Sequence, residues 1–208
     1  MPGFFFYLTA VTSPNEIFYT TFRSGNMRRQ KVKYTFLLPL LFPVVLPAQS
    51  KSEELIEWSA NRRLTWNDYK AKPEPGSGAA ASTTTYLGIE YDFSGGGFSF
   101  KISSSFSRDR SWGQNKSEYI LGHEQGHFDI AEIFARRLNK EMSEYEYNQT
   151  SYPQDLKKIY EEVMKDKEDM QNEYDDETDH SINRVKQAEW LKKIEKMLEE
   201  LKKYSDYH

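Results

Sequence analysis

The sequence contains no cysteine. This absence excludes disulfide bonds, metal sites with thiolate ligands and the lipid-modified cysteine of a lipoprotein, so a hydrophobic core, with or without a metal ion, must stabilise the fold. The sequence also lacks a run that could span a membrane. Its apolar segment at residues 36–46 has about half of the roughly 20 residues that such a helix needs, and Pro39 and Pro43 interrupt it.

Basic residues are fewer than acidic ones, with 28 Lys and Arg against 32 Asp and Glu and a formal net charge of −4. Residues 1–48 hold five of the basic residues and one of the acidic residues, so residues 49–208 carry a net charge of −8. A surface of this sign repels nucleic acids and anionic membranes. We therefore expect no nucleic-acid partner and, at about 160 residues, a single domain with one core.

Residues 27–48, MRRQKVKYTFLLPLLFPVVLPA, begin with a basic head, continue with an apolar middle and end with a small residue. This order is typical of an export signal, and the shortness of the apolar segment disfavours the alternative of a membrane anchor. We predict export of residues 49–208, with no membrane contact once the signal is removed. Because Met27 opens a well-formed signal, we interpret residues 1–26 as a misassigned upstream extension.

Alternating apolar residues predict two strands after a loop at residues 72–82 that is rich in Pro, Gly, Ala and Ser. SGGG at residues 94–97 separates the strands and is typical of a turn. The sequence therefore predicts a β-hairpin or a small antiparallel sheet. The apolar positions are Leu87, Ile89, Tyr91 and Phe93 in the first strand and Phe98, Phe100 and Ile102 in the second.

Three helices are predicted after the hairpin, which gives an α+β fold with the sheet packed on a long first helix. Asn115 and Glu118 resemble a capping pair, from which the first helix would extend to about Tyr147. An acidic loop, YDDETDHS at residues 174–181, would lead into the last helix. The apolar stripes are Ile120, Ile130, Ala131, Phe134 and Leu138, then Leu156, Ile159, Tyr160, Val163 and Met170, then Ile182, Val185, Leu191, Ile194, Leu198 and Leu201.

Residues 123–127 read HEQGH. On a helix this spacing places His123 and His127 one turn apart on the apolar face, where two ring nitrogens can hold one Zn²⁺ while Glu124 reaches a zinc-activated water. Buried histidines that only pack are the alternative, but each would need its own hydrogen-bond partner, whereas one metal ion satisfies both. Gly126 costs about 1 kcal/mol relative to alanine inside a helix, which indicates close approach to the backbone there, by a substrate or a neighbouring strand.

A catalytic zinc takes three protein ligands and leaves one position for water, so a distant segment must supply the third ligand. His180 is our candidate, and Glu177, Asp179 and Asp175 compete with it because carboxylates also bind zinc. His208 is the last residue, where a frayed chain end is expected.

Three segments carry a family resemblance: LTWNDY at residues 64–69, ILGHEQGHFDIAE at residues 120–132, and YDDETDH at residues 174–180 with the later Gln187 and Trp190. Together, over about residues 60–195, they resemble a bacterial family of unknown function whose members are regarded as secreted zinc-dependent proteases.

The resemblance implies a zincin-like fold, a bacterial source and a periplasmic or extracellular location. It also implies that His123, His127 and His180 are zinc ligands and that Glu124 is catalytic. Glycine usually follows the third histidine in this family, whereas this chain has Ser181.

The sequence therefore predicts an exported zinc-dependent hydrolase, most simply a peptidase in which Glu124 is the general base and a protein or peptide is the substrate. Two alternatives are an exported, non-catalytic zinc-binding protein with a structural or interaction role and a metal-free helical interaction module. The sequence indicates no oligomeric state.

Supporting groups are also predicted. The strand that ends near Phe106 could pair with an extended peptide. Tyr174 or Tyr119 could stabilise an oxyanion, and Asp129 and Asp175 could accept hydrogen bonds from imidazole N–H groups.

Overall fold

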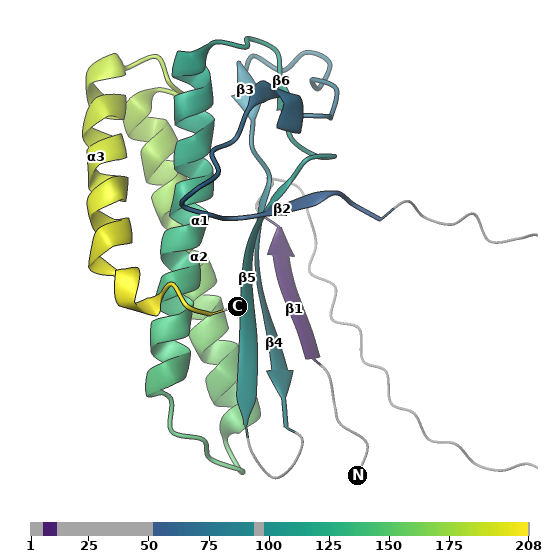
Figure 1. Cartoon of the computed structure of the whole chain (residues 1–208), viewed down its shortest axis with the longest axis vertical. Coiled ribbons are helices and arrows are strands. Elements are labelled where there is room, and N and C mark those ends of the chain that lie inside the picture. The colour runs from purple at the N-terminus through teal and green to yellow at the C-terminus, as the bar shows by residue number, and fades with distance from the viewer. Residues whose placement is uncertain (1–5, 12–51, 94–97, 208) are drawn as a thin grey trace, which may run out of the picture.

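The computed structural model describes residues 6–11, 52–93 and 98–207 (Figure 1). The predicted export signal at residues 27–48, the turn at residues 94–97, His208 and most of residues 1–26 lie outside the described residues. Within the described part of the chain, no helix combines the length and the apolar character needed to cross a bilayer.

A four-stranded antiparallel sheet forms one layer, with the strand order β1-β4-β5-β2. The predicted hairpin is confirmed, because β4 pairs with β5 from Thr85 opposite Phe106 to Asp92 opposite Ser99. A separate pair of short strands, β3 and β6, lies near the amino end of the first helix (Figure 1). The strands are β1 Phe6–Val11, β2 Leu55–Glu57, β3 Ala81–Ser82, β4 Thr85–Asp92, β5 Ser99–Ser107 and β6 Trp112–Gly113.

Three helices lie on one side of the sheet and pack against one another, with the first of them between the sheet and the last (Figure 1). They are α1 Glu118–Glu144, α2 Tyr152–Thr178 and α3 Arg184–Glu200, with short 3-10 turns at Trp66–Asp68 and Lys202–Tyr204. Helix α1 contacts β4 and β5 as well as α2 and α3. The predicted α+β fold, a small antiparallel sheet packed on a long helix that two further helices follow, is confirmed.

The predicted start and end of α1 are wrong by a few residues. The N-cap is Ser117, whose hydroxyl accepts a hydrogen bond from the Ile120 backbone N–H at 3.2 Å. A serine cap satisfies one of the free N–H groups of the first turn, so the helix begins three residues after Asn115. It ends at Glu144 rather than Tyr147.

The stretch at residues 174–181 is not the loop that we predicted. Helix α2 continues to Thr178, and only residues 179–183 connect it to α3. The predicted apolar stripe of the last helix is also wrong at its start, because Ile182 and Val185 have relative exposures of 74% and 70%. Ile182 precedes the helix, and the buried face of α3 consists of Gln187, Trp190 and Ile194.

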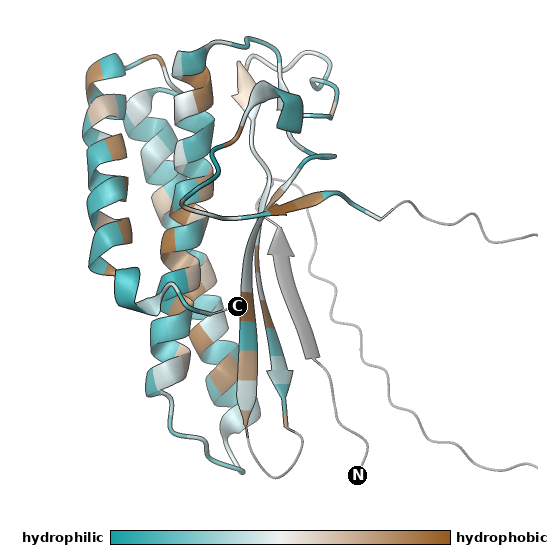
Figure 2. Cartoon of the chain, viewed as in Figure 1, coloured by the Kyte–Doolittle hydropathy of each residue, from teal (hydrophilic) through white to brown (hydrophobic). Residues whose placement is uncertain are grey.

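The hydrophobic core lies between the sheet and the helices. It contains residues from both layers, for example Leu87 of β4, Ile102 of β5, Ile133 of α1, Tyr160 of α2 and Ile194 of α3. In Figure 2 apolar residues recur between polar ones along the helices and along β4 and β5. All five apolar residues predicted to face inward on α1 are buried. This helix is therefore enclosed by the other elements, which gives its side chains fixed positions.

Buried polar contacts hold the LTWNDY region against α1. The Gln125 side chain accepts a hydrogen bond from the Leu64 backbone N–H at 2.8 Å and donates one to Asp129 at 2.8 Å. Asp129 also accepts a hydrogen bond from the indole N–H of Trp58 at 2.9 Å. The carboxylate of Asp129 thus supports this packing, and our prediction that it orients an imidazole is wrong.

Candidate metal centre

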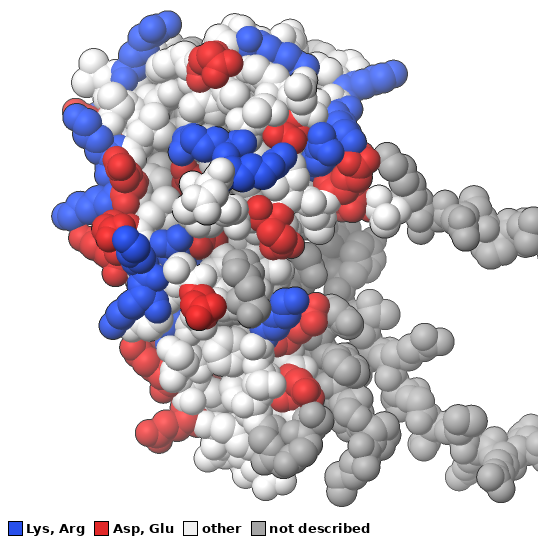
Figure 3. Space-filling view, in the orientation of Figure 1, with Lys and Arg blue, Asp and Glu red and all other residues white. Residues whose placement is uncertain are grey.

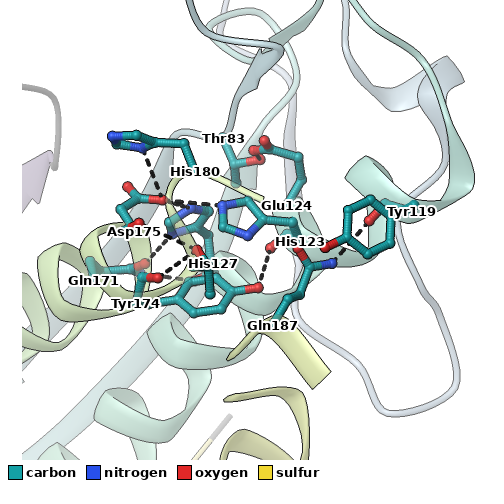
Figure 4. A network of polar contacts seen from close by, with 11 residues as sticks. Thr83, Tyr119, His123, Glu124, His127, Gln171, Tyr174, Asp175, His180 and Gln187 are labelled. Atoms are coloured by element: carbon teal, nitrogen blue, oxygen red, sulfur yellow. Dashed lines mark hydrogen bonds and ion pairs between the residues drawn. The ribbon is translucent and has the colours of Figure 1, made fainter. Parts of the chain in front are cut away.

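Helix α1 directs the side chains of His123 and His127 toward one carboxylate oxygen. The Nε2 atom of each ring lies 3.1 Å from Oδ1 of Asp175 on α2 (Figure 4). One possible ligand atom from each of these three residues lies within 4.8 Å of the others. Two imidazole nitrogens and a carboxylate oxygen are ligands that zinc accepts, so the three residues could hold a metal ion.

The electrostatics of this cluster favour a cation. Burial acts to lower the pKa of His127, but the hydrogen bond and the negative charge of Asp175 outweigh it and raise the pKa to about 9. Burial acts to raise the pKa of Asp175, but its bonds to the two imidazoles hold that pKa well below its usual range. Burial lowers the pKa of His123. Oδ1 of the anionic Asp175 carboxylate therefore faces two imidazole nitrogens. Each of these nitrogens can carry either a proton or a bound cation on the side of that oxygen.

Close packing of α2 on α1 brings Asp175 to the histidines. Tyr174 lies with its ring stacked on that of His123, at a centroid distance of 4.5 Å, and its hydroxyl donates a hydrogen bond to the backbone oxygen of His123 at 3.2 Å. This contact requires glycine opposite, because a Cβ at Gly126 would lie 2.5 Å from the Tyr174 hydroxyl oxygen. The close neighbour of Gly126 is therefore a side chain of α2, and not the substrate or strand that we predicted.

Replacement of Gly126 with alanine is expected to lower the free energy of unfolding by about 1–3 kcal/mol, because the new methyl group overlaps the buried Tyr174 ring. Gly122, one turn earlier on α1, is the matched control: a Cβ there meets nothing within 4 Å. Alanine at position 122 should raise the free energy of unfolding by about 0.5–1 kcal/mol through its higher helix propensity. Chemical denaturation measures both changes, and equal effects of the two substitutions would contradict the packing argument.

His180 lies at the rim of the cluster. Its Nδ1 is 3.6 Å from Oδ1 of Asp175, and its side chain is 71% exposed. The structure therefore brings the predicted third ligand close to the other two histidines, but Asp175 lies nearer to both. Of the competing carboxylates, Glu177 turns toward α3, where it accepts hydrogen bonds from Trp190 at 3.0 Å and Lys186 at 3.3 Å.

An unusual backbone conformation carries His180. Asp179, His180 and Ser181 have φ angles of 49°, 48° and 75°, the left-handed region that side chains other than glycine disfavour. Backbone hydrogen bonds from the His180 N–H to the Asp175 carbonyl oxygen at 3.0 Å and from the Asn183 N–H to the Thr178 carbonyl oxygen at 2.7 Å stabilise this turn. The φ angle at position 181 is one that glycine adopts more readily than serine, in keeping with the glycine that the resemblance implies at this position.

Replacement of Ser181 with glycine is accordingly expected to raise the free energy of unfolding by about 0.5–1 kcal/mol, because glycine adopts a positive φ without the steric cost of a Cβ. The control is Ser143→Gly, at an exposed position of α1, which should lower it by roughly 0.5 kcal/mol. Thermal unfolding of the two variants and the wild type measures both changes in stability. A destabilised Ser181→Gly variant would refute the strain at this turn.

Glu124 is buried beside the two histidines (Figure 4). Its neighbour on the other side is Thr83, the residue that follows strand β3. The Thr83 hydroxyl donates a hydrogen bond to the Glu124 carboxylate at 2.6 Å. Because Thr83 has one hydroxyl proton, the Tyr69 hydroxyl donates to Thr83, at 2.8 Å. Burial raises the pKa of Glu124, and the bond from Thr83 acts in the opposite direction. The last residue of LTWNDY thus helps to fix the predicted catalytic carboxylate.

Sequence reasoning missed Gln171 on α2. Its side chain accepts a hydrogen bond from Nδ1 of His127 and donates one to the backbone oxygen of His127 at 2.9 Å. A signal was present, because Gln171 lies one helical turn before Asp175 and therefore on the same face of the helix.

The two tyrosines considered for an oxyanion differ in their surroundings. The Tyr174 hydroxyl already donates to the backbone oxygen of His123. The Tyr119 hydroxyl is buried without a hydrogen-bond partner among the described residues, as are Nδ1 of His123 and Oε1 of Gln187. Gln187 reaches this region by donating to the backbone oxygen of Tyr119 at 3.1 Å.

The strand proposed to pair with a peptide is not at the edge of its sheet. Strand β2 covers β5 there, with Ile56 opposite Phe106. The strand that leads to the candidate site is β3, whose partner in the described chain is β6.

Comparison with known proteins confirms the resemblance to a bacterial family of unknown function. The model of the family described as "Bacterial protein of unknown function (DUF922)" matches residues 46–181. No curated protein and no solved structure matches the chain. The matched segment includes the HEQGH helix, Asp175 and His180, and it covers more than half of the sequence. The protein therefore belongs to this bacterial family of unknown function.

Proposed function

We propose that the protein is an exported zinc-dependent hydrolase with a zincin-like site, and most specifically a peptidase. The observation that carries this proposal is the convergence of His123, His127 and Asp175, whose ligand atoms lie within 4.8 Å, next to the buried carboxylate of Glu124. When bound, Zn²⁺ supplies a Lewis acid that polarises a carbonyl group and lowers the pKa of a water molecule.

Glu124 acts as the general base and then as the general acid. Its carboxylate takes a proton from the attacking water and returns it to the amine nitrogen as the carbon–nitrogen bond breaks. Burial supports this role because a raised pKa brings the carboxyl group nearer to the range in which it can both accept and release a proton. The Thr83 hydroxyl keeps the carboxylate in place during both transfers.

A peptide substrate fits the surroundings of Glu124. Strand β3 pairs with β6, and its other side is our candidate for pairing with an extended peptide whose scissile bond would then lie near Thr83 and Glu124. On the face seen in Figure 3, Lys and Arg side chains are interspersed with Asp and Glu. This mixture supports a protein or peptide substrate over a nucleic acid.

A non-catalytic zinc site is the second candidate, and one distance favours it. Nδ1 of His180 lies 3.6 Å from Oδ1 of Asp175, so His180 could complete a set of four protein ligands with His123, His127 and Asp175. Such a closed set is typical of structural zinc sites, whereas a catalytic site keeps one position for water.

Metal analysis and turnover measured on the same preparation test the proposal. We expect the purified chain to bind one zinc ion and to cleave an unstructured protein such as casein, with cleavage lost after chelation and restored by zinc but not by magnesium. Stoichiometric zinc without cleavage of casein or of a peptide mixture would favour the structural site. Absence of bound metal, together with a melting temperature that a chelator does not change, would refute both.

A further inference from the structure

We infer that Gln171 is a positioning residue that fixes the tautomer of His127, so that Nδ1 keeps its proton and Nε2 is the atom offered to a metal ion. This inference rests on the proposed metal site. Gln171 lies outside the HEQGH segment and would orient one of its two histidines.

The orientation of the Gln171 amide follows from the backbone of His127. A carbonyl oxygen can only accept a hydrogen bond, so the amide group that faces the His127 oxygen at 2.9 Å is the nitrogen, Nε2. The other end of the amide, Oε1, then faces Nδ1 of His127. An amide oxygen can only accept, and Nδ1 must therefore carry a proton.

The protonation of the ring decides which nitrogen can bind a cation. The Asp175 carboxylate that faces Nε2 can only accept a hydrogen bond, so a bound cation takes the place of the Nε2 proton; the other proton stays on Nδ1, and the lone pair belongs to Nε2. Nε2 lies 3.1 Å from Oδ1 of Asp175, on the side where Nε2 of His123 also points (Figure 4). Gln171 thus directs the lone pair toward the other two ligands rather than away from them.

The orienting amide of Gln171 and the proposed ligand Asp175 lie on the same helix. Gln171 and Asp175 are four residues apart on α2, so they lie on one face and approach α1 together. The two bonds from Gln171 to His127 restrain both the backbone and the ring of that residue. His123 has no equivalent support, since its Nδ1 lacks a hydrogen-bond partner among the described residues.

The first measurement needs no substitution. In the zinc-loaded protein, nitrogen-15 NMR of the imidazoles should show His127 with a protonated Nδ1 and a metal-bound Nε2. A protonated Nε2, with the metal on Nδ1, would overturn the inference. The chain has four histidines, and through-bond correlations from each backbone to its own ring assign their signals in the unsubstituted protein.

The second measurement compares two buried glutamines that each make two hydrogen bonds. Gln171→Met keeps the length of the side chain but removes both bonds to His127, and zinc affinity measured by competition with a chelator should fall about 10–100-fold. Gln125→Met removes the bonds to Leu64 and Asp129 instead, and it should change zinc affinity by less than about threefold because no orienting bond to a ligand is lost.

The outcomes separate the inference from the proposed function. If the wild-type chain binds no zinc, both fail. If the wild-type chain binds zinc and Gln171→Met binds it as tightly, the metal site stands and the positioning role of Gln171 is refuted. Equal losses in Gln171→Met and Gln125→Met would also refute it, because the effect would then come from general loss of packing.

Discussion

Replacement of Glu124 with glutamine is expected to reduce peptide hydrolysis by about 10²–10⁴-fold while one zinc ion remains bound to each chain. Glutamine has nearly the same shape as glutamate, and its amide oxygen can still accept the hydrogen bond from Thr83 that now holds the carboxylate. What it lacks is the ability to take up a proton at neutral pH. The substitution therefore removes the proposed general base and leaves the proposed metal ligands in place.

The measurement is kcat/KM for a cleaved peptide together with the metal content of the same sample. Glu118→Gln is the matched control, because Glu118 is exposed in the first turn of the same helix and should leave both values unchanged. Activity of Glu124→Gln within a factor of ten of the wild type would exclude Glu124 as the general base, since the expected loss starts near a hundredfold. Loss of the metal as well would indicate that Glu124 shapes the site rather than the reaction.

The second large effect concerns the ligands. We expect His123→Ala, His127→Ala and Asp175→Ala each to abolish stoichiometric zinc binding, because each removes one of three donors that converge within 4.8 Å. His180→Ala should keep one zinc ion per chain, since the His180 side chain is largely exposed and its Nδ1 lies 3.6 Å from the Asp175 oxygen. Elemental analysis measures the zinc content of each of the four purified variants.

The same four variants decide between the ligand set that the structure favours and the one that the family resemblance implies. Zinc retained by Asp175→Ala and lost from His180→Ala would establish His180 as the third ligand, with Asp175 as its neighbour. Loss from both variants, without turnover in the wild type, would indicate the closed four-ligand site. Circular dichroism of each metal-free variant checks that the loss of zinc does not come from loss of the fold.

Much of the fold follows from local pattern. The alternation along residues 87–93 and 98–102 predicted the hairpin, and the period of three and four residues predicted three helices, because burial of one face imposes these spacings. The two histidines of HEQGH were assigned to the interior for the same reason, and His123 is buried while His127 is mostly so.

The errors have physical causes that single-sequence patterns do not contain. Residues 174–178 read as a loop because of their charge, yet Tyr174 and Thr178 are fully buried and keep α2 helical through the site. Ile182 and Val185 read as core because they are apolar, but three residues in the left-handed region reverse the chain before them and leave both exposed. Tertiary packing and backbone conformation decided these positions.

Only part of the candidate site could be predicted from the sequence, for a related reason. Two proposed ligands and the proposed general base lie within five residues, where spacing is informative. Asp175, in contrast, competed with Glu177, which turns toward α3, and with Asp179, which lies beyond the last residue of α2. Gln171 and Thr83 each contact one residue of the candidate site from another element, Gln171 through two hydrogen bonds and Thr83 through one. Helical spacing places Gln171 on the same face as Asp175, but only the assembled fold shows which residue it contacts.

The contact between Gly126 and Tyr174 has a consequence for the evolution of this family. This contact sets the distance between α1 and α2, the two helices that carry the proposed ligands, since the tyrosine ring occupies the place that any side chain at position 126 would fill. Homologous chains should therefore vary at these two positions jointly: a relative with alanine or serine at the first should carry a smaller residue at the second.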